Sequence, residues 1–299
     1  MSVGVVVAVH GFAPYLQETL ESLLAQDPAP AQVIVVDDGS PVPVALSAPG
    51  VGLVRRARRG GPAAARATGE SQLGGELKWV AFCDADDAWT KASLSHRLEA
   101  IGEYAVCFGR VLVVGPDGRP TGERWAPPAE GVHGGEGFAR ALYRDNPICL
   151  SSAIVRRDAL AAAGGLSSAL RCGEDWDLWL RLAARGERFA CVPEEVVRYR
   201  RHPGGLTADV ASVARARLEV HRLHAGLVDE ALRREVRAGD LRGLARGLVR
   251  ERRYGAARAA LREAAALGFG SSLRERALAA VLAVPGARRV LGRRDPYRP

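Results

Sequence analysis

The stretch WVAFCDADDAW, Trp79 to Trp89, joins a run of apolar residues directly to a cluster of carboxylates. Residues Trp79 to Cys83 have the composition of a strand that is buried on both faces, which is typical of a parallel sheet. Three aspartates follow within four residues: Asp84, Asp86 and Asp87. Like charges this close repel one another unless a cation or hydrogen-bond donors compensate them. The stretch therefore predicts a buried strand that ends at a polar site.

The segments before this stretch alternate between strand and helix patterns. Short apolar runs rich in β-branched residues predict strands, whereas leucines at helical spacing and an alanine-rich segment opened by proline predict helices. This alternation indicates an α/β fold, with a mostly parallel sheet and helices on its faces. The predicted strands are Val3 to Val9, Val33 to Val36, Val51 to Arg55 and Trp79 to Cys83, and the predicted helices are Tyr15 to Leu24 and Pro62 to Gly69.

Two acidic turns follow predicted strands, namely Asp84 to Asp87 and Asp37-Asp38-Gly39-Ser40. Ligands of such sheets bind beyond the carboxyl ends of the strands, so we expect the two turns to converge. The first turn suits a hard divalent cation that shares nucleotide phosphates, and the second can accept hydrogen bonds from a nucleobase or a ribose. The alternatives are a helix cap for the first turn and a plain turn for the second.

The rest of the chain shows more helix patterns than strand patterns. Turn residues at positions 115–118 follow predicted strands, and from Ala211 onward only helical patterns are found. Residues Leu244 to Leu267 have the alternation of alanine with larger residues that two packed helices would show. The predicted elements are strands within Tyr104 to Val114, helices at Gly134 to Tyr143, Arg157 to Ala163 and Glu174 to Ala184, and a strand at Val196 to Tyr199. The predicted helix breaks lie near Gly239, Gly255, Gly268 and Pro285.

Three further segments carry side chains suited to chemistry. Glu174 and Asp175 begin a predicted helix and could supply a general base for a sugar hydroxyl, with Trp176 as a pocket wall; acids that complement the helix dipole are the alternative. His202 lies in a loop and is either a metal ligand or a structural histidine. Arg66 follows small residues and is either a phosphate clamp or a solvated helix arginine.

The chain has 299 residues and a formal net charge of +8, which is unevenly placed. Residues 211–299 hold 20 arginines, no lysine and 9 acids, a net charge of +11, whereas residues 1–210 have a net charge of −3. With 47% hydrophobic and 25% charged residues, the composition excludes disordered and fibrous proteins. The 5 cysteines form no Cys-x-x-Cys pair, which argues against a zinc site and a disulfide framework and predicts a reduced, cytoplasmic setting.

Taken in order along the chain, these motifs resemble the family 2 glycosyltransferases, which are inverting enzymes with the GT-A fold. The resemblance covers roughly residues 3–208, and it implies a glycosyltransferase domain at residues 1–208 followed by an arginine-rich helical region at residues 209–299. The matching segments are Val5 to Gln26, Val33 to Ser40 (VIVVDDGS), Gly61 to Gly69, Phe82 to Trp89, Asn146 to Arg156 with Gly164-Gly165, Glu174 to Leu182 (EDWDLWLRL) and Tyr199 to Thr207 (YRRHPGGLT).

The resemblance implies that a sugar moves from a nucleotide-diphosphate donor, a UDP-sugar first of all, to a hydroxyl of a glycan or lipid-linked acceptor. It implies Asp175 as the general base, with Glu174 as the fallback. It also implies a Mg²⁺ or Mn²⁺ ion held by Asp86 and His202 that offsets charge on the departing diphosphate. The implied donor contacts are Val9, Asp37, Asp38, Arg66, Asp84, Ala85 and Trp176.

The sequence departs from the family pattern around the donor pocket. The usual proline and Tyr-Asn of the first strand are Ala8 and His10-Gly11, Arg59 replaces the usual asparagine before the Arg66 helix, and Leu166-Ser167 replaces Phe-Asp in a turn. Because of these departures, the sequence does not identify the nucleobase or the sugar of the donor. Two other functions compete with sugar transfer. A nucleotidyltransferase would show a basic triphosphate loop, which residues 10–20 lack, and a sugar-nucleotide-binding scaffold would not need Asp175.

The basic region at residues 211–299 has three competing interpretations. It could contact an anionic membrane surface, where each basic residue contributes about 1 kcal/mol, bind an acidic glycan, or simply solvate helices. We expect peripheral contact with the inner face of the membrane by a cytoplasmic enzyme of bacterial polysaccharide biosynthesis. Nucleic acid is not an expected partner, because no aromatic residues for base stacking interleave with the arginines.

Overall fold

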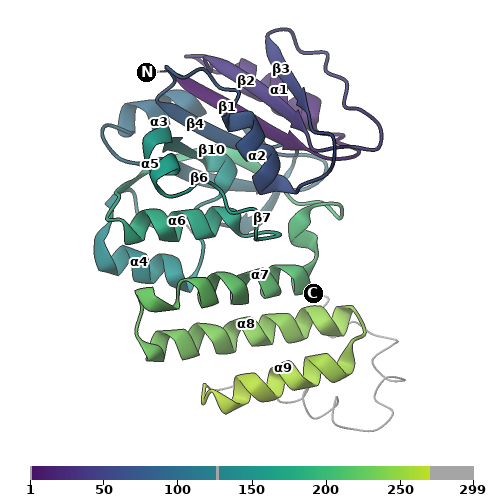
Figure 1. Cartoon of the computed structure of the whole chain (residues 1–299), viewed down its shortest axis with the longest axis vertical. Helices are drawn as coiled ribbons and strands as arrows, with labels where there is room; N and C mark the ends of the chain where they lie inside the picture. Colours follow the sequence, from purple (N-terminus) through teal and green to yellow (C-terminus); the bar gives the residue numbers. More distant parts are fainter. Residues whose placement is uncertain (1, 126–127, 270–299) are drawn as a thin grey trace. The chain divides into compact units, whose positions relative to one another are not determined.

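The computed structural model describes residues 2–125 and 128–269. The chain divides into two compact units, residues 1–203 and residues 204–299. The described strands all lie in the first unit, where they form one 10-stranded sheet, and the described part of the second unit is helical (Figure 1).

The N-terminal half of the sheet is parallel and runs in the order β3-β2-β1-β4. In the register of these strands, Val9 of β1 pairs with Asp37 of β2, and Ala8 pairs with Asp84 of β4. The two acidic turns therefore leave the same edge of the sheet on either side of the end of β1, as the sequence predicts. The strands are β1 (Val3–Val9), β2 (Gln32–Asp37), β3 (Val51–Arg55) and β4 (Trp79–Asp84).

Two helices cover opposite faces of this parallel half. The odd-numbered valines of β1 share a core cluster with Leu20 of α1 (Leu16–Leu24). On the other face, a Cβ atom added to Gly69 of α2 (Pro62–Glu70) would lie 2.4 Å from Val6 Cγ1, so only glycine allows this close approach. Arg66 lies on the same buried face of α2 as Gly69, one turn earlier.

The second half of the sheet is mixed. Strand β9 (Ala153–Arg156) is antiparallel to both β4 and β6, whereas β10 (Phe189–Arg200) is parallel to β6. A short antiparallel pairing of β10 with β5 (Ala88–Trp89) places Val197 opposite Trp89. This pairing carries the end of β10 back to the acidic turn after β4. The remaining strands are β6 (Val106–Val114), β7 (Pro120–Arg124) and β8 (Gly131–His133).

Three helices of this half, α4, α5 and α6, agree with the sequence prediction to within one residue at the ends, whereas the fourth, α3, is not predicted by the sequence. Strand β10 is longer than predicted, because it begins at Phe189 rather than at Val196, and the short strands β5 and β9 have no strong sequence pattern of their own. The α/β architecture expected of a GT-A fold is confirmed. The helices are α3 (Ser93–Ala100), α4 (Gly135–Arg144), α5 (Arg157–Ala162) and α6 (Glu174–Ala184).

The second unit places three helices side by side in chain order, α7 (Val210–Leu223), α8 (Glu230–Arg250) and α9 (Tyr254–Ala266) (Figure 1). The break predicted near Gly239 is wrong, because α8 runs through this residue. A mid-helix glycine costs about 1 kcal/mol relative to alanine, and the burial of the residues around it, such as Ala238 and Leu241, offsets that cost. The helix ends near Gly255 and Gly268 are confirmed, and Pro285 lies outside the described residues.

The arginines of this unit are partly used within it. Asp240 of α8 is buried, forms an ion pair of 2.8 Å with Arg217 of α7 and is hydrogen-bonded to His221 of the same helix as Arg217. Arg237 of α8 pairs with Glu263 of α9 at 2.5 Å. Among the residues that the structure describes, no helix combines the length and the apolar character needed to cross a membrane.

Candidate active site

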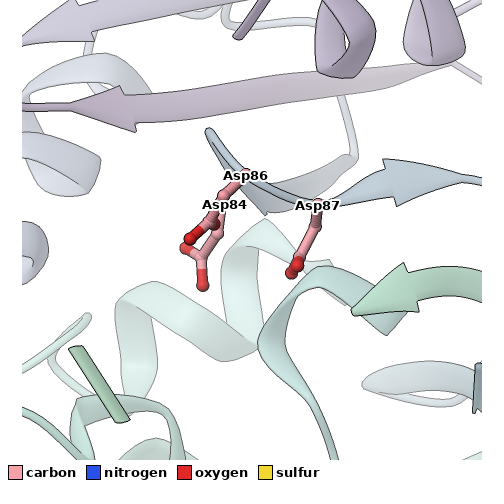
Figure 2. A group of neighbouring side chains, drawn as sticks. All are labelled: Asp84, Asp86 and Asp87. Carbon is pink, nitrogen blue, oxygen red and sulfur yellow. The ribbon is translucent and has the colours of Figure 1, made fainter. Parts of the chain in front are cut away.

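The acidic turn after β4 brings three carboxylates together. One carboxylate oxygen from each of Asp84, Asp86 and Asp87 lies within 4.8 Å of the others. Asp87 is buried, whereas Asp84 and Asp86 are half-buried. Figure 2 shows that the three side chains project to the same side of the turn. The sequence prediction of a clustered acidic site at the end of this strand is confirmed.

The chemistry of the acidic turn fits a hard divalent cation. Burial and the charge of Asp84 raise the pKa of Asp86, and burial with both neighbouring charges raises the pKa of Asp87 well above its ordinary value. Asp87 Oδ2 is buried without a hydrogen-bond partner among the described residues. Oxygen ligands of this kind are those that Mg²⁺ and Mn²⁺ prefer. A bound cation would relieve the repulsion that raises these pKa values.

His202 lies beside this turn. Its Nε2 atom is 2.9 Å from Asp86 Oδ2, and its ring centroid is 5.2 Å from that of Tyr15. The pairing of β10 with β5 explains this position, because it brings the chain after β10 past the acidic turn. The two residues predicted as metal ligands, Asp86 and His202, are therefore neighbours, although they are 116 positions apart in the sequence.

Arg66 joins the acidic turn to the start of α6. Its guanidinium forms ion pairs with Asp84 through Nη2 and with Glu174 through Nη1. Arg66 is only 4% exposed, which excludes a solvated helix arginine. Burial alone would lower the pKa of Arg66, but the charges of Asp84 and Glu174 raise it above its usual range. The side chain is a buried, permanently charged bridge between two elements of the site.

Asp175 lies next to this bridge, in the first turn of α6. Asn146 Nδ2 donates a hydrogen bond of 3.0 Å to Asp175 Oδ2, and Asn146 Oδ1 in turn accepts from the Ile148 amide at 3.1 Å. Burial and the charge of Glu174 raise the pKa of Asp175 to about 7. Asp175 as a whole residue is half-buried. A carboxylate that titrates near neutral pH can accept a proton from an acceptor hydroxyl.

The carboxylate of Asp37 is used within the protein. It accepts hydrogen bonds from the amides of Ser40 at 2.8 Å and Val44 at 3.2 Å, and from Arg55 at 3.0 Å. Burial acts to raise the pKa of Asp37, but the bonds from Ser40 and Val44 and the charge of Arg55 lower it below its ordinary value. Asp37 therefore shapes the turn after β2. Its predicted contact with the nucleotide-sugar donor stays a prediction.

Asp38 closes the loop that precedes α2. Its carboxylate accepts from the Gly60 amide at 2.9 Å and from the Gly61 amide at 2.7 Å, and it lies 3.2 Å from Arg56 Nε. The Asp38 amide donates to the carbonyl of Val9 at 2.8 Å. These bonds fix the ends of β1 and β2 against the loop, and the predicted donor contacts of Val9 and Asp38 stay predictions.

Trp176 is buried between two helices. It is 3% exposed, and its indole Nε1 donates to the carbonyl of Leu142 at 2.6 Å. The ring thus packs α6 against α4, and its predicted roles as a pocket wall and donor contact stay predictions. Helical spacing puts Trp176 on the buried face of α6, which the position beside Asp175 conceals. Ala85 is half-buried and packs against the core of the sheet, and its donor contact stays a prediction.

Two polar residues of the site carry no strong signal of their own in the sequence. Asn146 orients Asp175, and the Ser151 hydroxyl accepts a hydrogen bond of 3.0 Å from the Asp84 amide. Both lie in the segment Asn146 to Arg156, one of the segments that carry the family resemblance. Their partners, Asp175 and Asp84, are 29 and 67 positions away in the sequence, and no local pattern predicts these contacts.

Comparison with known proteins agrees with this geometry. A family model described as glycosyl transferase family 2 matches residues 4–163. The succinoglycan biosynthesis protein ExoW of Rhizobium meliloti (strain 1021) is 34% identical over 101 residues, which cover 31% of this chain and 32% of ExoW. The match thus spans about a third of the length of this relative.

Several solved structures share the fold. TarS 1–349 of S. aureus has a TM-score of 0.59 at 19% identity and covers 98% of this chain and 90% of its own. The same fragment in complex with UDP-GlcNAc has a TM-score of 0.61 at 18% identity, over 94% and 90% of the two chains. The mannosyltransferase PcManGT of Pyrobaculum calidifontis, in complex with GDP-Man and Mn²⁺, has a TM-score of 0.57 at 20% identity, over 99% and 84%. The fold, the converging acidic turns and the family match over more than half of the chain show that this protein belongs to glycosyl transferase family 2.

Proposed function

We propose that this glycosyltransferase moves a sugar from a nucleotide-diphosphate sugar to a hydroxyl group of a glycan or a lipid-linked acceptor, with inversion at the anomeric carbon and a requirement for Mg²⁺ or Mn²⁺. The observation that carries the proposal is the chain of contacts from the acidic turn through Arg66 to α6. It connects a group of carboxylates suited to a cation with Glu174 at the start of α6, the residue next to the carboxylate suited to a base, Asp175.

The donor side of the site lies at the end of β4. Asp84, Asp86 and His202 would hold the ion, which offsets the charge that develops on the departing diphosphate. Structural neighbours contain UDP-GlcNAc in one case and GDP-Man with Mn²⁺ in another. We propose a UDP-sugar as the donor here, with contacts from Asp37, Asp38 and Arg66. The residues Val9, Asp84 and Ala85 complete the proposed donor contacts.

Asp175 performs the proton transfer in this proposal. Its carboxylate takes the proton of the acceptor hydroxyl as the acceptor oxygen attacks the anomeric carbon. The new bond between carbon and oxygen forms on the face opposite the diphosphate, which leaves with the electron pair of the bond that breaks. The hydrogen bond from Asn146 keeps the carboxyl group turned toward the acceptor side. Inversion follows from this single displacement.

Glu174 serves the site in another way. It is 5% exposed, and its carboxylate is engaged with the buried Arg66. Its Oε1 atom accepts from Nη1 of Arg66, and a Glu174 carboxylate turned toward an acceptor would leave this buried guanidinium without one of its partners. We therefore assign the base to Asp175 and the stabilisation of Arg66 to Glu174.

The test is a transfer assay with UDP-, GDP- and dTDP-sugars in the presence of Mn²⁺, which scores both transfer and hydrolysis of the donor. We expect turnover with a UDP-sugar, and we expect Asp175→Asn to abolish transfer while donor binding survives. Asp158→Asn is the matched control, because Asp158 is an exposed aspartate that pairs with Arg156 outside the site. Failure of every donor to bind or react would refute the proposal, and full turnover of Asp175→Asn would remove Asp175 from the role of base.

We also propose that the basic region at residues 211–299 makes peripheral contact with an anionic membrane surface. Its 20 arginines exceed its 9 acids, although ion pairs such as Arg237–Glu263 use part of this charge. The measurement is co-sedimentation of the whole protein with phosphatidylglycerol vesicles at low salt, with phosphatidylcholine vesicles as the control. Equal binding to both kinds of vesicle, or to neither, would contradict this proposal.

A further inference from the structure

Arg200, the last residue of β10, contacts the acidic turn from its buried side. It is 4% exposed. Its main-chain amide donates to Asp87 Oδ1 at 2.9 Å, and its side-chain Nε donates to the carbonyl of Asp86 at 3.0 Å. One residue therefore holds both a side chain and the main chain of the turn that carries the carboxylates.

The far end of the Arg200 side chain is anchored to other elements. Nη2 forms an ion pair of 2.7 Å with Glu18 of α1, and the guanidinium carbon lies 4.3 Å from the centre of the Tyr15 ring. Nη1 lies 3.4 Å from the carbonyl of Gly115 and 3.3 Å from that of Pro116, in the turn between β6 and β7. The turn after β4 is thus tied to α1 and to the β6–β7 turn through a single guanidinium.

Tyr15 extends this arrangement to His202. The ring of Tyr15 contacts the Arg200 guanidinium and also lies 5.2 Å from the His202 ring. Tyr15 therefore packs against both Arg200 and the histidine that is 2.9 Å from Asp86. Asp86 follows β4 and His202 follows β10, two strands that are not adjacent in the sheet, so their relative placement depends on contacts of this kind.

We propose that Arg200 is a positioning residue for the acidic turn. Through the carbonyl of Asp86 on one side and Glu18 on the other, it holds Asp86 and His202 in the arrangement that binds the divalent cation. This role rests on the proposed function, because it presumes a metal at the turn. Arg200 does not contact the reacting atoms, and it acts through the groups that it orients, as residues behind metal ligands do.

The experiment measures Mn²⁺ binding to the full chain without substrate, from the electron paramagnetic resonance signal of free Mn²⁺. Loss of a residue that orients metal ligands weakens a site by about tenfold or more, so we expect a drop of about tenfold for Arg200→Gln. Glu18→Ala removes only the anchor and should weaken binding by less than about tenfold. Arg201→Gln is the matched control, because Arg201 is the neighbouring arginine and pairs with Glu123 instead, at 2.7 Å.

A purely electrostatic role predicts the opposite sign. Arg200 is a cation near an anionic site, so its removal would then tighten Mn²⁺ binding, and tighter binding by Arg200→Gln would overturn the proposal. Arg200→Lys keeps the charge but cannot reach Asp86 and Glu18 together, so its binding should also be weakened, and wild-type affinity in this variant would overturn the proposal as well.

Two further measurements distinguish a failure of this proposal from misfolding of a variant and from a failure of the proposed function. Glu18 has a side chain that is 47% exposed, so Glu18→Ala keeps the test valid if substitutions at buried Arg200 unfold the chain. At saturating Mn²⁺, kcat of the Glu18→Ala variant should return to the wild-type value while the KM for Mn²⁺ stays raised. If the wild type binds no Mn²⁺, the metal requirement fails and the positioning role fails with it; if the wild type binds and every variant equals it, only the positioning role fails.

Discussion

The hydrogen bond from Asn146 to Asp175 makes a prediction about the pH dependence of transfer. The pKa of Asp175 is raised to about 7 by burial and by Glu174, and the bond from Asn146 acts in the opposite direction by stabilising the ionised form. A base must be deprotonated to act, so kcat/KM of the wild type should fall below about pH 7 with the slope of a single proton. Removal of the bond in Asn146→Ala should move this acid limb to higher pH.

The size of the shift follows from the energy of the bond. A hydrogen bond to a charged group contributes about 1.5–3 kcal/mol, and one pKa unit corresponds to about 1.4 kcal/mol. Asp175 is half-buried, and solvent replaces part of the lost bond, so we expect the lower end of this range, an upward shift of about one unit.

A second substitution at the same position is the control for loop distortion. Asn146→Asp keeps an acceptor for the Ile148 amide, so the loop stays closed, but it sets a second carboxylate against Asp175. Its acid limb should lie higher still, because like charges raise the pKa of a carboxyl group. The assay is kcat/KM against pH from 5 to 9 for the three proteins, with saturating metal. Equal acid limbs, or a limb of Asn146→Ala below that of the wild type, would refute the assignment of this limb to Asp175.

Three other predictions concern stability and metal binding. Asp175 has a pKa near 7 in the fold and an ordinary value of 3.8, so its ionisation opposes folding as the pH rises from 3.8 through 7. Asp175→Asn should therefore raise the free energy of unfolding by about 1–2 kcal/mol at pH 8 and by much less at pH 4. The measurement is urea denaturation at both pH values, and an equal increase in the free energy of unfolding at each pH would contradict the prediction. Asp86→Ala should bind Mn²⁺ more weakly than the wild type in calorimetry. Its Tm should not fall, because the substitution removes a carboxylate that its neighbours repel. Wild-type affinity for Mn²⁺ would remove Asp86 from the metal site. Gly69→Ala should destabilise the fold by about 1–3 kcal/mol through overpacking against Val6, with Gly75→Ala, whose added Cβ meets nothing within 4 Å, as the control in the same denaturation series.

The sequence predicts the parts of the site that lie at the ends of buried strands. An apolar run followed by aspartates defines both the strand and its end, and the parallel register then brings Asp37 and Asp84 to the same edge. The elements with strong periodicity, such as α6, also agree with the structure. These features follow from local patterns together with one rule about parallel sheets.

The features that the sequence does not predict depend on contacts between distant segments. The partners of Arg66 and Asn146 come from segments 108 and 29 positions away, and no local pattern distinguishes a buried arginine from a solvated one. The burial of Trp176 is not evident from its position beside Asp175, because adjacent residues on a helix point about 100° apart. Gly239 was misread because packing around α8 outweighs its weak helix propensity.

The bridge formed by Arg66 has a consequence for attempts to change the specificity of this enzyme. An exchange of segments between relatives would treat each half of the site as a separate module. Here one guanidinium neutralises a carboxylate from each half, Asp84 on β4 and Glu174 on α6. A transplanted α6 segment without an acid at position 174, or a transplanted α2 without Arg66, would leave a buried charge uncompensated on the half that was not exchanged. Chimaeras should therefore be cut so that α2, the end of β4 and the start of α6 are inherited together.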